Sequence, residues 1–255
     1  MLTLNDIRQI PDVRHYLDRA DGVLGSIGYT EHGRRHASVV SKRARAVMEA
    51  LERSAREREL AAIAAYLHDI GNIVNRDHHA QSGAVLAHHI LREAGMAIED
   101  VIEIVTAIGH HHETDGAPVS DIAAAVILAD KSDVHRSRVR DKAMIKLDIH
   151  DRVNFAVTHS ALKVVGPHSA AEMTGERGNG GGEPNSSGDR ASIEITDHES
   201  GDAKPVITLA LKIDTSIAPV MEYFEIFLPR MILSNRAADR LGATYKLVMN
   251  ETLVL

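Results

Sequence analysis

Residues 64–89, AAYLHDIGNIVNRDHHAQSGAVLAHH, join the end of an apolar segment to five histidines. Residues 60–70 are almost entirely Ala, Leu, Ile and Tyr, which predicts a central helix that is buried on most sides. Gly71 and Asn72 then end or loosen this helix. His68 and Asp69 therefore lie at the end of a buried helix, at positions where apolar residues would otherwise be expected.

Working outward from this stretch, residues 1–150 predict successive helices with short breaks. Residues 37–56 carry an apolar stripe with a period of 3.6 residues, flanked by Arg, Lys and Glu. Two more amphipathic helices are predicted over residues 80–94 and 98–110. Ser120 and Asp121 predict the capped start of a helix that runs to about Arg138.

The pattern changes after about residue 150. Residues 152–165 are rich in β-branched residues, and residues 191–200 and 205–215 alternate, so each segment predicts a strand. A Gly-rich stretch at about 174–190 predicts a mobile loop. Residues 219–242 predict a helix with a kink at Pro229 and a stop at Gly242, followed by a final strand over 243–255. The expected fold is mainly α, with a helical bundle over 1–150 and a small α+β domain over 151–255.

Composition excludes several classes of protein. A formal charge of −7, with three Phe and no Trp, argues against a non-specific nucleic-acid binder. The absence of cysteine excludes disulfides and thiolate metal sites, and it agrees with a reducing cytoplasm. No apolar run approaches the roughly 18–20 residues of a membrane span, and the first residues lack the apolar core of a signal peptide. We expect a cytoplasmic protein that binds neither nucleic acid nor membrane.

Histidine is the unusual total, because ten of the 16 lie between His32 and His112. Imidazole and carboxylate groups fall on different predicted helices or helix ends, and a bundle can bring such groups together in its core. Neutral imidazole and carboxylate suit Mn, Fe, Ni, Zn or Mg, and an aspartate can bridge a pair of ions. The groups are His36, His68, Asp69, His79, His111, His112 and Asp130.

Four of these segments, in this order, resemble the HD-domain superfamily of metal-dependent phosphohydrolases. The resemblance covers about residues 20–140 and implies a helical bundle with a binuclear site. RRHASVV (34–40) resembles the first helix of the family, and LHDIGN (67–72) resembles its His-Asp doublet. HHAQSGAVL (78–86) and ILADKSD (127–133) resemble its later ligand segments. The implied metal ligands are His36, His68, the bridging Asp69, His79 and Asp130.

Two branches of the superfamily share further features with this chain. HHETDG (111–116) is similar to a segment of HD-GYP cyclic-dinucleotide phosphodiesterases, in which both histidines bind metal. This similarity implies His111 and His112 as ligands. His32 lies four residues before His36 and is expected on the same helical face, where HD-GYP enzymes can carry an extra ligand, so it suggests a third ion. The GYP motif is absent, however, and Asn72 replaces the lysine that follows the doublet. VILADKSDVHRSR (126–138) is instead similar to small HD hydrolases that cleave dinucleoside polyphosphates.

Other polar residues near these motifs have alternative interpretations. His88 and His89 lie about 15 Å along the helix from His79, so they are expected at the surface. His110 is expected to be a spectator, and Asp133 either orients a ligand or lies in solvent.

The cations Lys131, Arg136, Arg138 and Arg140 either bind phosphate or complement a helix C-terminus. We expect Lys131 and Arg136 to assist catalysis together with Asp69.

The resemblance implies a hydrolase that uses two divalent ions and a metal-activated water. The expected substrate is a small phosphate ester or anhydride, with a nucleotide as the specific expectation. Two alternatives stay open, an HD-type di-iron oxygenase and a non-catalytic regulatory module. The apolar helix around Phe224, Phe227 and Met231 also suggests a homodimer.

Overall fold

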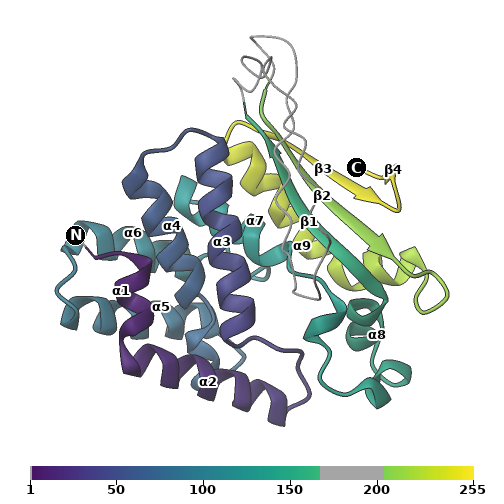
Figure 1. Cartoon of the computed structure of the whole chain (residues 1–255), viewed down its shortest axis with the longest axis horizontal. Coiled ribbons are helices and arrows are strands. Elements are labelled where there is room, and N and C mark those ends of the chain that lie inside the picture. The colour runs from purple at the N-terminus through teal and green to yellow at the C-terminus, as the bar shows by residue number, and fades with distance from the viewer. Residues whose placement is uncertain (1, 167–203) are drawn as a thin grey trace, which may run out of the picture.

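The computed structural model describes residues 2–166 and 204–255, which form a helical bundle beside a small sheet (Figure 1). The predicted mainly α fold is confirmed. The helices are α1 (Leu4–Gln9), α2 (Pro11–Ser26), α3 (Arg34–Ala50), α4 (Ala55–Leu67), α5 (His79–Glu93), α6 (Ile98–Gly109), α7 (Asp121–Lys131), α8 (Ile149–Ala156) and α9 (Val220–Arg240), with 3₁₀ turns η1 (Ile70–Ile73), η2 (Arg136–Arg138) and η3 (Lys142–Lys146). The strands are β1 (Val157–Val165), β2 (Val206–Ile213), β3 (Thr244–Met249) and β4 (Thr252–Leu253).

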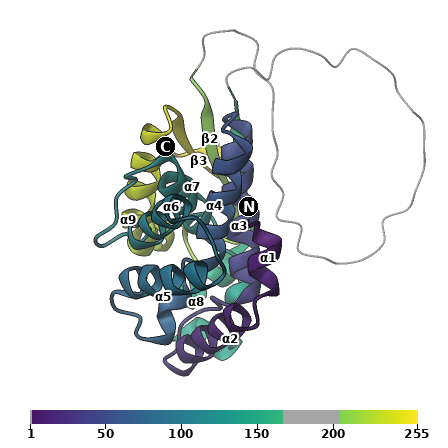
Figure 2. The ribbon, with the colours of Figure 1, turned by 90° about the vertical axis from the view of Figure 1, so that its left-hand side faces the viewer.

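Helix α4 is the centre of the bundle and contacts α3, α6 and α7 (Figure 2). It begins at a capping box in which Ser54 and Glu57 each satisfy the other's backbone N–H. Every residue from Leu60 to Leu67 is buried, as the apolar run predicts. The predicted helix over residues 37–56 is too long, because α3 ends at Ala50 and the chain turns at Glu52 with a φ of 55°.

Helix α7 begins as predicted but ends earlier. The Ser120 side chain accepts a hydrogen bond from the backbone N–H of Ala123. The helix stops at Lys131, so the prediction that it continues to about Arg138 is wrong. The chain turns there because Asp133 folds back and accepts a hydrogen bond from His36 of α3.

The sheet has the order β1-β2-β3-β4. Strands β1 and β2 are antiparallel, β2 and β3 are parallel, and β3 and β4 are antiparallel. Helix α9 makes the crossover between the parallel strands β2 and β3 and also contacts α7. The predicted strand over 205–215 and the helix containing Pro229 are confirmed. The predicted final strand is split into β3 and β4 by a turn in which Asn250 and Glu251 have positive φ.

The predicted strand over 152–165 is wrong in its first part, which belongs to α8. Asp148 caps this helix by accepting hydrogen bonds from the backbone N–H groups of His150 and Asp151. The cap and the first turn override the β-branched composition of the segment. The predicted loop at 174–190 and the predicted strand at 191–200 lie outside the described residues.

Bundle and sheet share one apolar core, which runs from Leu4 in α1 to Met249 in β3. The division at residue 150 therefore stays a prediction.

On α9, Phe227 and Met231 are buried, whereas Met221, Leu228 and Ile232 are exposed. The homodimer also stays a prediction. Within the part of the chain that the structure describes, no helix has the length and apolar character needed to cross a membrane.

Candidate metal centre

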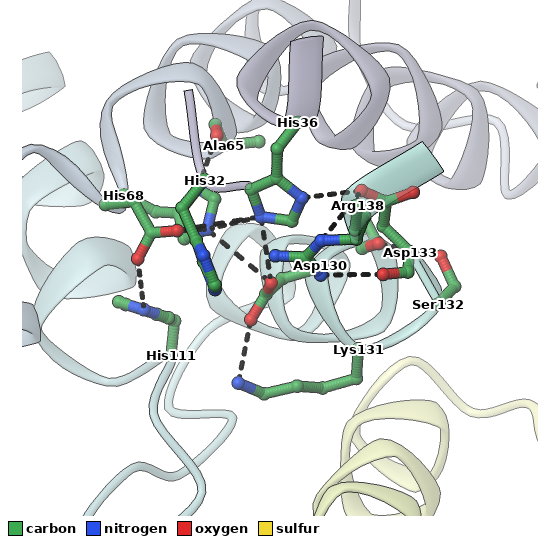
Figure 3. A network of polar contacts seen from close by, with 12 residues as sticks. His32, His36, Ala65, His68, His111, Asp130, Lys131, Ser132, Asp133 and Arg138 are labelled. Carbon is green, nitrogen blue, oxygen red and sulfur yellow. Dashed lines mark hydrogen bonds and ion pairs between the residues drawn. The ribbon is translucent and has the colours of Figure 1, made fainter. Parts of the chain in front are cut away.

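Predicted ligand residues converge where several helices of the bundle end, as Figure 3 shows for His36, His68, His111 and Asp130. His36 comes from the first turn of α3, and Asp130 comes from the last turn of α7. His68 and Asp69 follow directly after α4, His79 is the first residue of α5, and His111 follows α6. Of these six side chains, Asp130 is partly buried and the other five are buried.

Four donor atoms form one compact set. His36 Nε2 lies 3.3 Å from His68 Nε2, 3.6 Å from Asp69 Oδ2 and 3.3 Å from Asp130 Oδ1. His68 Nε2 lies 3.2 Å from the same Asp69 oxygen and 3.6 Å from the same Asp130 oxygen. Ligands bonded at about 2.1 Å to one ion lie about 3.0 to 3.4 Å apart in octahedral or tetrahedral geometry. The set therefore has the size that a single divalent ion requires.

The second oxygen of Asp69 faces a second set of donors. Asp69 Oδ1 lies 3.4 Å from His79 Nε2 and 4.0 Å from His111 Nε2. The two imidazole nitrogens lie 3.1 Å apart. Because one carboxylate presents an oxygen to each set, Asp69 has the geometry of a bridging ligand.

The hydrogen bonds of the four imidazoles decide which nitrogen faces the centre. In each ring Nδ1 donates to an oxygen, and this leaves Nε2 of the neutral ring without a proton. The lone pairs on the Nε2 atoms therefore face the centre. The buried Asp69 Oδ2 has no hydrogen-bond partner, and both features fit a bound cation. The acceptors are Asp133 Oδ2 for His36 (2.6 Å) and the backbone oxygens of Ala65 for His68 (2.7 Å), Arg76 for His79 (2.9 Å) and Ile108 for His111 (2.7 Å).

The electrostatics differ between the two sets. Burial lowers the pKa of His79 to about 4 and holds the pKa of His111 well below its usual range. Burial also acts to lower the pKa of His68, but the carboxylates of Asp69 and Asp130 outweigh it and raise the pKa to about 10. His79 and His111 are therefore neutral at pH 7, whereas a cation must displace a proton from His68.

Several residues hold the ligands in place. Asp133 is 2% exposed, and it accepts a second hydrogen bond from Arg35 (3.1 Å) besides the bond from His36. The hydrogen bond from His36 and the charge of Arg138 overcome burial and keep the pKa of Asp133 well below its usual range. Of the two alternatives for Asp133, this geometry is that of a carboxylate that orients a ligand. The Asn72 amide donates to Asp69 Oδ1 at 2.9 Å.

Two predicted histidines lie at the margin of the cluster. His112 is partly exposed, and its ring centroid lies 4.9 Å from that of His79. His32 is buried, its Nδ1 donates to Thr30 O at 2.6 Å, and its ring centroid lies 5.5 Å from that of His36. The expectation that His32 shares a helical face with His36 is wrong, because α3 begins only at Arg34.

The predicted catalytic cations have different surroundings. Lys131 is buried, and its Nζ lies 2.7 Å from Asp130 Oδ2 and 2.6 Å from Glu113 Oε2. Arg230 of α9 binds the other oxygen of Glu113 at 3.2 Å. Arg136 stacks over the ring of Phe155 at 5.1 Å and is not part of the cleft wall beside the cluster. This placement separates Arg136 from the metal centre.

A cleft of about 630 Å³ opens beside His32, His79 and His112. Its wall includes the cations Arg76, Arg138 and Arg230, which suit an anionic ligand.

Sequence reasoning missed Arg76, Glu113 and Arg230. Only Glu113 had a sequence signal, since it completes the HHE segment. As expected, His88 and His89 are exposed.

Comparisons with known proteins agree with the domain that these motifs suggest. The family model described as HD domain matches residues 34–135, which include the seven predicted ligands of the two ions but not His32. An uncharacterised protein of Methanocaldococcus jannaschii is 31% identical over 150 residues, which are 50% of this chain and 57% of that protein. The chain thus spans little more than half of that relative.

One similar solved structure is that of a predicted HD superfamily hydrolase from an uncultured Thermotogales bacterium. It is 25% identical, with a TM-score of 0.39, over 57% of this chain and 80% of that one.

Proposed function

We propose that this protein is a metal-dependent phosphohydrolase that cleaves a phosphate ester or anhydride with water, because the HD-domain family model matches residues 34–135. We propose a nucleotide as the substrate class. The observation that carries the proposal is the pair of donor sets on the two oxygens of Asp69, with four imidazole Nε2 atoms turned inward.

The residues fit two divalent ions. His36, His68, Asp130 and one oxygen of Asp69 would hold the first ion, while the other Asp69 oxygen, His79 and His111 would hold the second. His112, beside His79 at the cleft, is proposed as a further ligand of this second ion. Ions bound in this way lower the pKa of water and neutralise charge on phosphoryl oxygens.

The remaining polar residues would position the ligands and the substrate. Lys131 holds Asp130 Oδ2, so that the oxygen facing His36 and His68 keeps its direction. Asn72 does the same for Asp69 through Oδ1. The guanidinium groups of Arg76 and Arg138 line the cleft next to the cluster and are placed to bind phosphoryl oxygens.

A substrate panel with metal analysis tests the proposal. Phosphate release is measured from nucleotides, cyclic dinucleotides and p-nitrophenyl phosphate with Mn, Fe, Ni or Mg. We expect Asp69→Ala to lose bound metal and to slow hydrolysis by more than about 100-fold, because both donor sets lose an oxygen. The exposed His89→Ala is the control and should match the wild type.

Two results would contradict the proposal. Asp69→Ala with full metal content and undiminished phosphate release would exclude this centre as the site of hydrolysis. Two bound irons with oxygen consumption, and no phosphate release from any ester, would instead favour the di-iron oxygenase.

A further inference from the structure

Helix α8 forms another part of the cleft wall, here called the far wall, which no part of the proposed hydrolysis uses. Asp148, Asp151 and Asn154 line the cleft from this side. Contacts lead from the metal centre to this wall through Arg230, which binds Glu113 and stacks on Phe227 at 4.6 Å. The Phe227 ring then lies 6.5 Å from the ring of His150 in α8.

Asp151 is the unusual residue of this wall. It is only 6% exposed and lines the cleft. Among residues 2–166 and 204–255, no side chain or backbone group donates a hydrogen bond to its carboxylate, and no cation pairs with it. Burial and the neighbouring Asp148 raise the pKa of Asp151. A largely buried carboxylate without a protein donor is costly. The oxygens of Asp151 are not among the fully buried unpartnered atoms of the described residues, so a donor that enters the cleft could reach them and relieve this cost.

Asn154 adds a second acceptor one turn along the same helix. It is 5% exposed, and its amide nitrogen donates to His150 O at 2.8 Å. That bond leaves the carbonyl oxygen Oδ1 to accept. Residues spaced i and i+3 share a helix face, so Asp151 and Asn154 present acceptor oxygens to the same ligand.

The two ends of the cleft therefore favour opposite chemistry. Arg76 and Arg138 suit a phosphoryl group beside the metal centre, whereas Asp148 and Asp151 would repel a second phosphate at the far wall.

We propose that the substrate is a phosphate ester whose organic group carries hydroxyl or amino donors, which Asp151 accepts at the far wall with the help of Asn154. The inference rests on the proposed function, since it assigns the phosphate to the metal end.

Three esters of one carbon skeleton test this inference. Propyl phosphate has no donor on its organic group, glycerol phosphate carries two hydroxyls, and 3-aminopropyl phosphate carries an amine. Dissociation constants from calorimetry and kcat/KM values are compared for the wild type, Asp151→Asn and the exposed control Asp12→Asn. The two donor esters separate hydroxyl recognition from amine recognition.

We expect the wild type and Asp12→Asn to prefer a donor ester over propyl phosphate, and Asp151→Asn to reduce that preference by about 10-fold or more. Asp151→Asn should also raise the unfolding temperature by about 2–4 °C, because it removes a buried charge without a donor. A purely structural role for Asp151 would instead lower this temperature.

An unchanged preference in Asp151→Asn, or a wild type that binds all three esters equally, would overturn the inference. A preference in binding that depends on Asp151 without any hydrolysis would contradict the proposed function and support the inference.

Discussion

Substituting Gly71 with alanine tests how the structure places His79. Gly71 lies in η1, where the start of α5 approaches it most closely. A Cβ atom at Gly71 would lie 2.0 Å from His79 O and 2.4 Å from Gly83 N, whereas ordinary contacts begin at 3.4 Å. Both neighbours are backbone atoms and cannot rotate away. The two segments must therefore separate by the difference of about 1.4 Å.

This displacement exceeds what a metal site tolerates. Ligand distances vary by only about 0.2 Å around their normal values, so a shift several times larger would remove His79 from its donor set. We expect α5 to yield and the set around His36 and His68 to keep its geometry, because α3, α4 and α7 pack against one another in the bundle. Overpacking of this kind costs about 1–3 kcal/mol. In a chain of this size, such a cost lowers the unfolding temperature by about 2–12 °C.

Metal content and thermal unfolding measure the effect, with Gly22→Ala as the matched control. Gly22 also lies in a helix, but a Cβ there would meet no atom within 4 Å. We expect Gly22→Ala to keep the wild-type metal content and to be as stable or slightly more stable. We expect Gly71→Ala to lose one ion per chain. Wild-type metal content and an unchanged unfolding temperature in Gly71→Ala would refute the reasoning.

Two more predictions concern the set around His36. Replacing Asp133 with asparagine removes the charge that orients His36, so metal affinity should fall by about 10–100-fold. Competition with a chelator measures this affinity. An affinity within twofold of the wild type would contradict the orienting role of Asp133. The raised pKa of His68, about 10, means that its proton must leave when an ion binds. Metal affinity should then rise about tenfold per pH unit between pH 7 and 9. Calorimetry in buffers of different ionisation enthalpy should show one proton released per chain. Binding without proton release would show that His68 is already neutral.

Local patterns in the sequence predicted the helical part of the fold well. The apolar run before His68 predicted the buried centre of α4, and Ser120 predicted the start of α7. These signals are short-range, because a cap or a 3.6-residue period involves residues within a few turns. Where a distant contact ends a helix, the local pattern was misleading. Helix α7 continues in the pattern but stops at Lys131, where the chain turns back to His36.

The same distinction applies to the candidate site. The types and order of His36, His68, Asp69, His79 and Asp130 pointed to metal chemistry from the sequence alone, since neutral imidazole and carboxylate are ligands that divalent ions prefer and the segments resemble a known metal-binding family. Tertiary structure alone decided that Arg138, not Arg136, borders the cleft. It also paired Glu113 with Arg230, 117 residues away, and left Asp151 buried without a donor. Such pairings depend on how helices and sheet pack, and periodicity within one segment carries no information about them.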